Sequence, residues 1–127
     1  PAPVAESEIP GLIDELPLLA VVAAFGSGTL EIRGARELKL KESDRIAAVA
    51  EGLQAIGADA TAHDDGWTIR GNGVPRGGTV DARGDHRIAM AFLVAGLRAK
   101  EGVRVEGADA AAVSDPGFLA RLRSLAR

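Results

Sequence analysis

The chain has 127 residues, of which 46% are hydrophobic and 26% charged, and a formal net charge of −3 at pH 7. This size fits one globular domain with its own core, and the acidic balance argues against nucleic-acid binding, which needs a basic excess. No apolar run reaches the roughly 18 residues of a membrane span and no signal peptide is recognisable, so we expect a soluble, cytoplasmic protein without a membrane partner. The absence of Cys excludes disulfides, thiolate metal sites and a cysteine nucleophile.

The first ten residues differ in character from the rest. Residues 1–10 are rich in Pro and acidic side chains, show no apolar period and begin without Met. Such a segment resembles a linker more than the first strand of a domain. We therefore expect an excised piece of a longer protein, with its folded part over residues 11–127.

Apolar periodicity, alternation and Gly stops predict helices and strands that follow one another along the chain. In chain order we expect a helix over 12–25, a strand over 29–33, a helix from 43 to 57, hairpin strands over 58–63 and 67–70, a strand over 79–82, a helix over 85–99, a strand over 103–106 and a helix over 118–125. Pro17 fits the first turn of its helix if Asp14 lies near the N-cap. The alternation predicts an α/β fold in which helices cover a sheet.

The order of elements occurs twice. Both halves contain the same features in the same order, about 72 positions apart. Each has an acidic residue, then a helix, a Gly, a strand, a Gly-Ala step and a second helix. Two related units, over about 11–70 and 79–127, are the simplest interpretation. A shared α/β rhythm also produces part of this match by itself.

Two charged clusters stand at predicted helix starts. Lys41-Glu42-Ser43-Asp44-Arg45 precedes one apolar helix, and Gly84-Asp85-His86-Arg87 opens another. Free backbone N–H groups and the helix dipole favour anions at such positions, and the guanidinium fork binds carboxylate and phosphate in a bidentate manner. Together with Asp14 at a third helix start, these clusters predict an anion-binding pocket around Lys41, Arg45 and Arg87. For either cluster alone, ordinary helix capping and a solvated face is the alternative.

Asp14 and Glu42 distinguish this pocket from a simple anion site. Carboxylates weaken anion binding, so their presence favours proton transfer, with one acid protonated and one ionised. We interpret His86 as structural, because its neighbours already cap the helix, and nothing singles out His63. The two His have no zinc-type spacing, so we expect no transition-metal site.

Three motifs in fixed order resemble one enzyme family. They are Ile13-Asp-Glu-Leu-Pro17, Leu38-Lys-Leu-Lys-Glu-Ser-Asp-Arg-Ile46 and Gly84-Asp-His-Arg-Ile-Ala-Met-Ala91. This set is similar to the C-terminal part of the 3-phosphoshikimate 1-carboxyvinyltransferase (EPSP synthase) family, from about Ile9 onward. The resemblance implies a partial lobe of repeated βαβαββ units around helices, an inside-out α/β barrel, with the active site between two lobes.

The resemblance also implies a reaction. Members transfer the enolpyruvyl group of phosphoenolpyruvate to the 5-hydroxyl of shikimate 3-phosphate, in chorismate biosynthesis, and need no metal or organic cofactor. By resemblance, Asp14 contacts the shikimate hydroxyl as proton acceptor, and Glu42 protonates the methylene carbon of phosphoenolpyruvate. Lys41 resembles a contact to shikimate 3-phosphate, while Arg45 and Arg87 resemble the phosphoenolpyruvate clamps, where glyphosate also binds.

Departures from the family pattern and other functions qualify these expectations. Some relatives carry a Lys before the final Pro-containing turn, where this chain has Val113-Ser-Asp-Pro116, and that phosphoenolpyruvate contact is therefore in doubt. The N-terminal lobe is missing, so we expect the chain alone to be inactive. A fragment of a UDP-N-acetylglucosamine enolpyruvyl transferase and a non-catalytic anion-binding module are the two alternatives.

Overall fold

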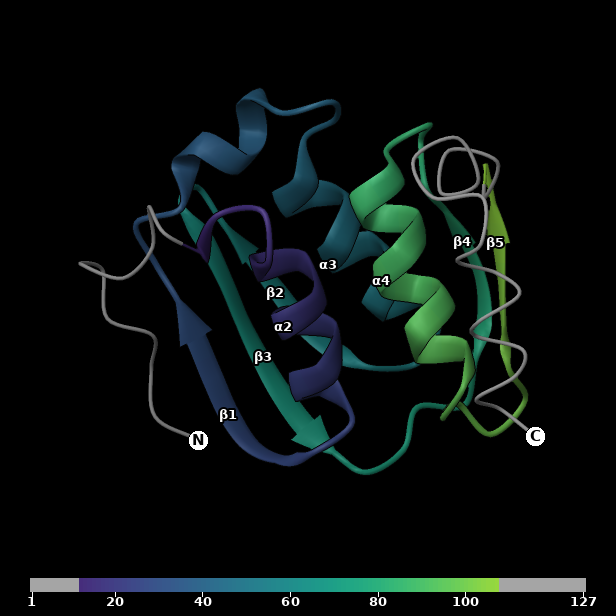
Figure 1. Ribbon diagram of the computed structural model, residues 1–127. Helices are drawn as coiled ribbons and strands as arrows, with labels where there is room; N and C mark the ends of the chain where they lie inside the picture. The colour runs from purple at the N-terminus through teal and green to yellow at the C-terminus, as the bar shows by residue number, and fades with distance from the viewer. Residues whose placement is uncertain (1–11, 108–127) are drawn as a thin grey trace.

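Two sheets flank three α-helices in the part of the chain that the computed structural model describes, residues 12–107 (Figure 1). In chain order the elements are α2 (Leu16–Ala24), β1 (Ser27–Ile32), the 3₁₀ helix η2 (Arg36–Leu40), α3 (Arg45–Ala55), β2 (Asp59–His63), β3 (Gly66–Asn72), β4 (Gly78–Asp81), α4 (His86–Gly96) and β5 (Val103–Glu106). None of the helices in this range is long and apolar enough to cross a bilayer. The expected helix over 118–125 and Val113 lie outside the described residues.

The strands form two separate sheets, whereas the sequence suggested one. The first sheet is antiparallel with the order β1-β3-β2, and the second pairs β4 with β5 in parallel. The hairpin of β2 and β3 is confirmed. The parallel pair arises because α4 serves as the crossover between β4 and β5, as parallel neighbours require. The strands pair antiparallel in the first proposed unit and parallel in the second. The division of the chain into two related units, over about 11–70 and 79–127, stays a prediction.

Aliphatic side chains fill the space between the sheets and the helices. Helix α2 packs against β3 and α4, α3 against β2 and β4, and α4 against β5. Two aromatic side chains, Trp67 and Phe92, are fully buried in this core. The indole N–H of Trp67 donates to the carbonyl oxygen of Ile46 at 2.8 Å, which fixes the first turn of α3 to β3.

Helices α3 and α4 approach each other closely at one point. A Cβ at Gly52 of α3 would lie 2.4 Å from the ring of Phe92 in α4, so the lack of a side chain at this position lets the two helices come this close. The starts of α3 and α4 carry the two charged clusters. Helix packing therefore brings together residues that lie about 40 positions apart in the chain.

Two of the three helix starts are capped by aspartate. Asp44 accepts from the backbone N–H of Ala47, and Asp85 accepts from that of Arg87. Helix α3 therefore begins at Arg45, two residues later than expected. The prediction for α2 was wrong in a different way, because the helix begins at Leu16 with Glu15 at the N-cap position and no side-chain cap. Asp14 precedes that position, which leaves its carboxylate to other partners.

Candidate active site

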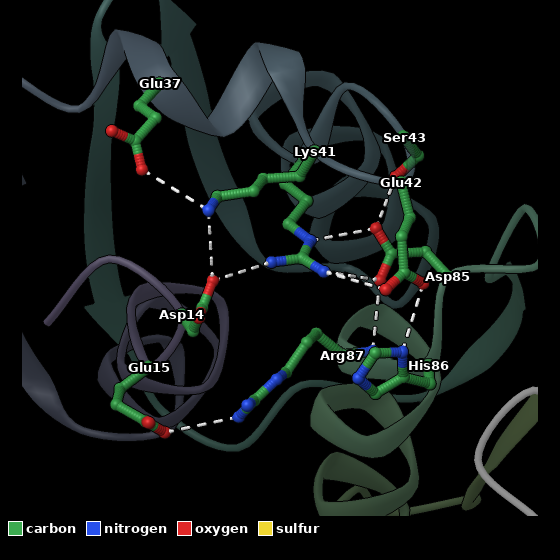
Figure 2. Close-up of polar contacts among 10 residues, drawn as sticks. Asp14, Glu15, Glu37, Lys41, Glu42, Ser43, Asp85, His86 and Arg87 are labelled. Carbon is green, nitrogen blue, oxygen red and sulfur yellow. Dashed lines mark hydrogen bonds and ion pairs between the residues drawn. The ribbon is translucent and has the colours of Figure 1, made fainter. Parts of the chain in front are cut away.

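Three segments far apart in the sequence place their charged side chains together, at the starts of α2, α3 and α4. Asp14 comes from the turn before α2, and Lys41 comes from the segment between η2 and α3 (Figure 2). Arg45 belongs to the first turn of α3. One carboxylate oxygen of Asp14 lies 3.3 Å from Nη1 of Arg45 and 3.5 Å from Nζ of Lys41. Asp14 thus connects two of the three predicted cations.

Arg45 is held by a buried carboxylate. Its Nε donates to Oδ2 of Asp85 at 2.8 Å and its Nη2 donates to Oδ1 at 3.1 Å, a bidentate pair. The side chain of Arg45 is 3% exposed and that of Asp85 is fully buried. Pairs with this geometry are among the stronger charge-assisted hydrogen bonds, and breaking one inside a protein leaves an uncompensated charge.

Further donors keep Asp85 ionised. Ser43 donates its hydroxyl to Oδ2 at 2.8 Å, and the backbone N–H of Arg87 donates to Oδ1 at 3.0 Å. Burial by itself would raise the pKa of Asp85, but the hydrogen bonds from Arg45 and Ser43 and the positive charge of Arg45 lower it below its ordinary value. The carboxylate is therefore negative at neutral pH and fixed in one orientation.

Lys41 and Arg87 have looser partners. Lys41 lies 3.3 Å from Oε2 of Glu37 in addition to Asp14, and Nη1 of Arg87 lies 3.6 Å from Oε2 of Glu15 (Figure 2). Glu15 and Glu37 are both more than 60% exposed. Exposed ion pairs contribute about 0–1 kcal/mol, so an anionic ligand can displace these acids with little loss.

Glu42, which lies just before α3, contacts His86 at the start of α4. Nδ1 of His86 and Oε2 of Glu42 lie 3.0 Å apart, within hydrogen-bonding distance, and the other carboxylate oxygen lies 3.9 Å from Nη2 of Arg45. The Glu42 carboxylate is half exposed. His86 therefore contacts a candidate site residue, and Asp85 caps the helix as expected of a neighbour of His86. His63, in contrast, pairs with Thr68 within the hairpin.

Glu42, Asp85 and His86 also offer three potential metal-ligand atoms within 4.8 Å of one another. Both oxygens of Asp85 already accept hydrogen bonds from Arg45, and the guanidinium would repel a cation placed there. A metal would have to displace this buried pair. The arrangement therefore favours an anion site over a metal site.

A small pocket opens beside Arg87, between α2 and α4. It has a volume of about 90 Å³ and is lined by Asp14, Glu15, Leu18, Arg87, Met90, Ala91 and Val94. Pockets that enclose a small-molecule ligand usually measure about 300–1,000 Å³. The described residues therefore do not enclose a small-molecule ligand in this pocket by themselves.

Sequence reasoning missed the parts played by Asp85, His86, Glu15 and Glu37. Asp85 and His86 belong to the second charged cluster, but capping explained both without a long-range partner. The spacing of Glu37 and Lys41, four positions apart, was a signal for an ion pair. Nothing in the sequence indicated that Glu15 would pair with Arg87.

The starts of α2, α3 and α4 bring these cations and acids together, and comparisons with known proteins give the family. The sequence model of the family described as EPSP synthase (3-phosphoshikimate 1-carboxyvinyltransferase) matches residues 1–122. The chain therefore belongs to the EPSP synthase family. This confirms the resemblance noted in its motifs.

Curated relatives and solved structures agree with this assignment. A 3-phosphoshikimate 1-carboxyvinyltransferase of Desulfitobacterium hafniense (strain DSM 10664 / DCB-2) is 51% identical over 118 residues, which cover 93% of this chain and 27% of the relative. The protein of the same name from Synechococcus sp. (strain JA-3-3Ab) is also 51% identical over 118 residues, covering 92% of this chain and 26% of the relative. An EPSP synthase structure from Acinetobacter baumannii matches with a TM-score of 0.90 and 39% identity, over 98% of this chain and 29% of that chain.

These matches bear on the fold and on the extent of the chain. The expected α/β fold of a partial enolpyruvyl-transferase-type lobe is confirmed by the similarity to the solved EPSP synthases. The chain spans about a quarter of the length of the curated relatives that it matches.

Proposed function

We propose that this chain provides one wall of the active site of a 3-phosphoshikimate 1-carboxyvinyltransferase. That enzyme would transfer the enolpyruvyl group of phosphoenolpyruvate to the 5-hydroxyl of shikimate 3-phosphate and release phosphate. The observation that carries the proposal is the gathering of Asp14, Lys41, Glu42, Arg45 and Arg87 from the starts of three helices. Family membership supports it, because relatives half identical to this chain bear the name of that activity.

The cations would hold the two anionic substrates. Lys41 binds the phosphate of shikimate 3-phosphate, and Arg45 and Arg87 hold phosphoenolpyruvate, whose carboxylate and phosphate suit the guanidinium fork. Lys41 and Arg87 exchange their exposed partners Glu37 and Glu15 for substrate. Arg45 keeps its buried partner and uses its remaining N–H groups.

The acids would move the protons. Glu42 donates a proton to the methylene carbon of phosphoenolpyruvate, which leaves a cationic centre at the neighbouring carbon. The 5-hydroxyl of the shikimate substrate attacks that centre and gives its proton to Asp14. Transfer of a proton from the new methyl group to one of the two carboxylates, together with departure of phosphate, then restores the double bond. Arg45, 3.3 Å from Asp14 and 3.9 Å from Glu42, lies between the two acids.

Catalysis would require the remainder of the enzyme. The pocket of about 90 Å³ leaves substrates open to water, and the chain spans 27% of the Desulfitobacterium relative. Positioning of reactants supplies about 7–11 kcal/mol of many enzymatic rate enhancements, and one wall cannot provide it. The chain alone is therefore expected to be inactive.

A chimera tests the proposal. This chain replaces the matching 118-residue segment of the Desulfitobacterium hafniense relative, and phosphate release from phosphoenolpyruvate is measured with shikimate 3-phosphate or UDP-N-acetylglucosamine as acceptor. We expect the chimera to release phosphate with shikimate 3-phosphate and not with UDP-N-acetylglucosamine, and we expect no activity from the isolated chain. Turnover with UDP-N-acetylglucosamine would instead indicate a UDP-N-acetylglucosamine enolpyruvyl transferase. A folded chimera that binds phosphoenolpyruvate without turnover would indicate that the chain is a non-catalytic anion-binding module.

A further inference from the structure

We propose that Asp85 is a positioning residue for phosphoenolpyruvate, which it controls by fixing the guanidinium of Arg45. The inference rests on the proposed function, because it takes Arg45 as a substrate contact. It adds a residue that touches no substrate itself. Three features of the structure support it.

The first feature is the way Arg45 divides its donors. A guanidinium has five N–H groups. Arg45 gives two of them to Asp85, through Nε and Nη2, and one to Asp14, through Nη1. One N–H on Nη1 and one on Nη2 make no hydrogen bond within the described residues. Because Asp85 takes the Nε edge of the fork, it determines where these two groups point.

The second feature is the rigidity of Asp85 itself. Its two oxygens accept from Arg45, from the hydroxyl of Ser43 and from the backbone N–H of Arg87, and its side chain is fully buried. These donors come from two helix starts, so a rotation of the carboxylate would break bonds to both. A group held this way transmits its geometry to its partner.

The third feature is the turn that delivers Asp85. Arg83 has φ 56° and Gly84 has φ 71°, so two consecutive residues adopt the left-handed region just before the cap. Two hydrogen bonds hold Arg83 in this conformation. Its backbone N–H donates to Oδ1 of Asp81, and its Nη2 donates to Oε1 of Glu51 at 2.8 Å. Left-handed backbone at a non-glycine residue is costly and concentrates at functional sites. This turn leads into Asp85 and places its carboxylate within hydrogen-bonding distance of the guanidinium of Arg45.

A purely stabilising role explains these features less well. Burying an Arg–carboxylate pair costs desolvation energy that its attraction roughly repays, and apolar replacements of such pairs are often neutral or stabilising. Arg87, the other proposed clamp, has an exposed carboxylate partner at 3.6 Å. Asp85 thus gives Arg45 a fixed orientation that Arg87 lacks.

Asp85→Asn in the active chimera tests the inference. Asn caps helices as well as Asp, but its amide presents one oxygen and one NH₂ to Arg45, so the fork loses one acceptor and faces a donor. We expect the KM for phosphoenolpyruvate to rise about tenfold or more, and the KM for shikimate 3-phosphate to change less than about threefold. Asp44→Asn removes the charge of the other capping aspartate, which contacts Ala47 and not Arg45, and should leave both constants unchanged.

A double-mutant cycle separates positioning from general damage. If Asp85 acts through Arg45, Asp85→Asn adds little to the phosphoenolpyruvate KM of Arg45→Lys, whereas independent roles would give multiplicative effects. Full multiplicativity, or an unchanged phosphoenolpyruvate KM in Asp85→Asn, would overturn the inference. A parent chimera without turnover would instead count against the proposed function.

Ser43→Ala keeps the test open if Asp85→Asn does not fold. It removes one donor to Oδ2 of Asp85 and leaves both charges in place. We expect a rise of about threefold in the phosphoenolpyruvate KM, which disappears in the Arg45→Lys background. An unchanged KM in Ser43→Ala would contradict the positioning role.

Discussion

Nε of Arg45 and Oδ2 of Asp85 lie 2.8 Å apart in the interior, although 40 residues separate them along the chain. The bond joins the first turn of α3 to the N-cap of α4. It therefore links the packing of two helices to the geometry of the candidate active site. The two proposed phosphoenolpyruvate clamps differ in this respect, because the partner of Arg87 is exposed.

Arg45→Ala and Arg87→Ala should accordingly have different effects. In the chimera, Arg45→Ala is expected to raise the KM for phosphoenolpyruvate and to cost about 3–5 kcal/mol of stability, because Asp85 stays buried without its partner. Arg87→Ala should raise the same KM but cost less than about 1 kcal/mol, since it loses an exposed pair. Denaturant unfolding and steady-state kinetics measure both effects. Equal stability losses would contradict the distinction, and unchanged KM values would remove the clamp roles.

His86 should affect turnover through Glu42. His86→Phe removes the ring nitrogen 3.0 Å from the Glu42 carboxylate, so the acid loses a hydrogen bond that orients it. We expect kcat to fall about tenfold, less than the roughly 100- to 10,000-fold that a group transferring the proton itself contributes. The matched change His63→Phe, in the hairpin, should leave kcat unchanged. Equal kcat values for His86→Phe and the parent would show that His86 does not act through Glu42 and is a structural residue.

The sequence predicted much of this molecule because its local signals are strong. The hairpin followed from the turn at Asp64-Asp65-Gly66, and the stripe from Ile46 to Ile56 predicted α3 apart from its exact start. Helix α2 has no such stripe, being apolar around its circumference, so its start was placed four residues early. The 3₁₀ helix η2 lacks a distinctive period, so the sequence predicted only a connector there.

The candidate site was only partly predictable for a different reason. Charge and helix starts indicated Asp14, Lys41, Glu42, Arg45 and Arg87, and the motifs proposed their roles. Pairing between elements depends on packing, for instance on the contact of Gly52 with Phe92 that brings α3 to α4. The burial of Asp85 and the contact of His86 with Glu42 depend on contacts between elements far apart in the chain, which local sequence patterns do not show.

Gly52 and Gly96 provide a matched test of that helix contact. Alanine generally favours helices over glycine by about 1 kcal/mol. Gly52→Ala should nevertheless destabilise the protein, because its Cβ would lie 2.4 Å from Phe92. Gly96→Ala meets its neighbours at 3.5 Å or more and should be neutral or stabilising. Thermal unfolding of the two chimeras measures the difference, and a Gly52→Ala variant as stable as Gly96→Ala would contradict the packing argument.

Acid should weaken the structure through carboxylates with lowered pKa. Burial raises the pKa of Asp85, but the hydrogen bonds from Arg45 and Ser43 bring it below its ordinary value. The pKa of Asp65 is lowered by hydrogen bonds from the backbone N–H of Gly34 and from the side chain of Arg33. The pKa of Asp64 is lowered by its hydrogen bond with Lys39. Because the unfolded chain binds these protons more readily, the stabilisation is present above the ordinary value of 3.8 and is lost as the pH falls through the folded values.

The melting temperature of the chimera should therefore fall as the pH drops below about 4. Asp85→Asn removes one titrating group, so its melting temperature should be lower near neutral pH and should approach the parent value in acid. Parallel pH profiles for the parent and Asp85→Asn would show that Asp85 does not contribute.

Deuterium incorporation tests the proton-donor role of Glu42 most directly. If an acid protonates the methylene carbon and a proton later leaves the methyl group, the parent chimera in D₂O should place deuterium in the methylene of its product. Glu42→Gln should lose incorporation and phosphate release together, by about 100-fold or more, while Glu31→Gln on strand β1 should keep both. Turnover and incorporation at the parent rate in Glu42→Gln would contradict the proposed active site.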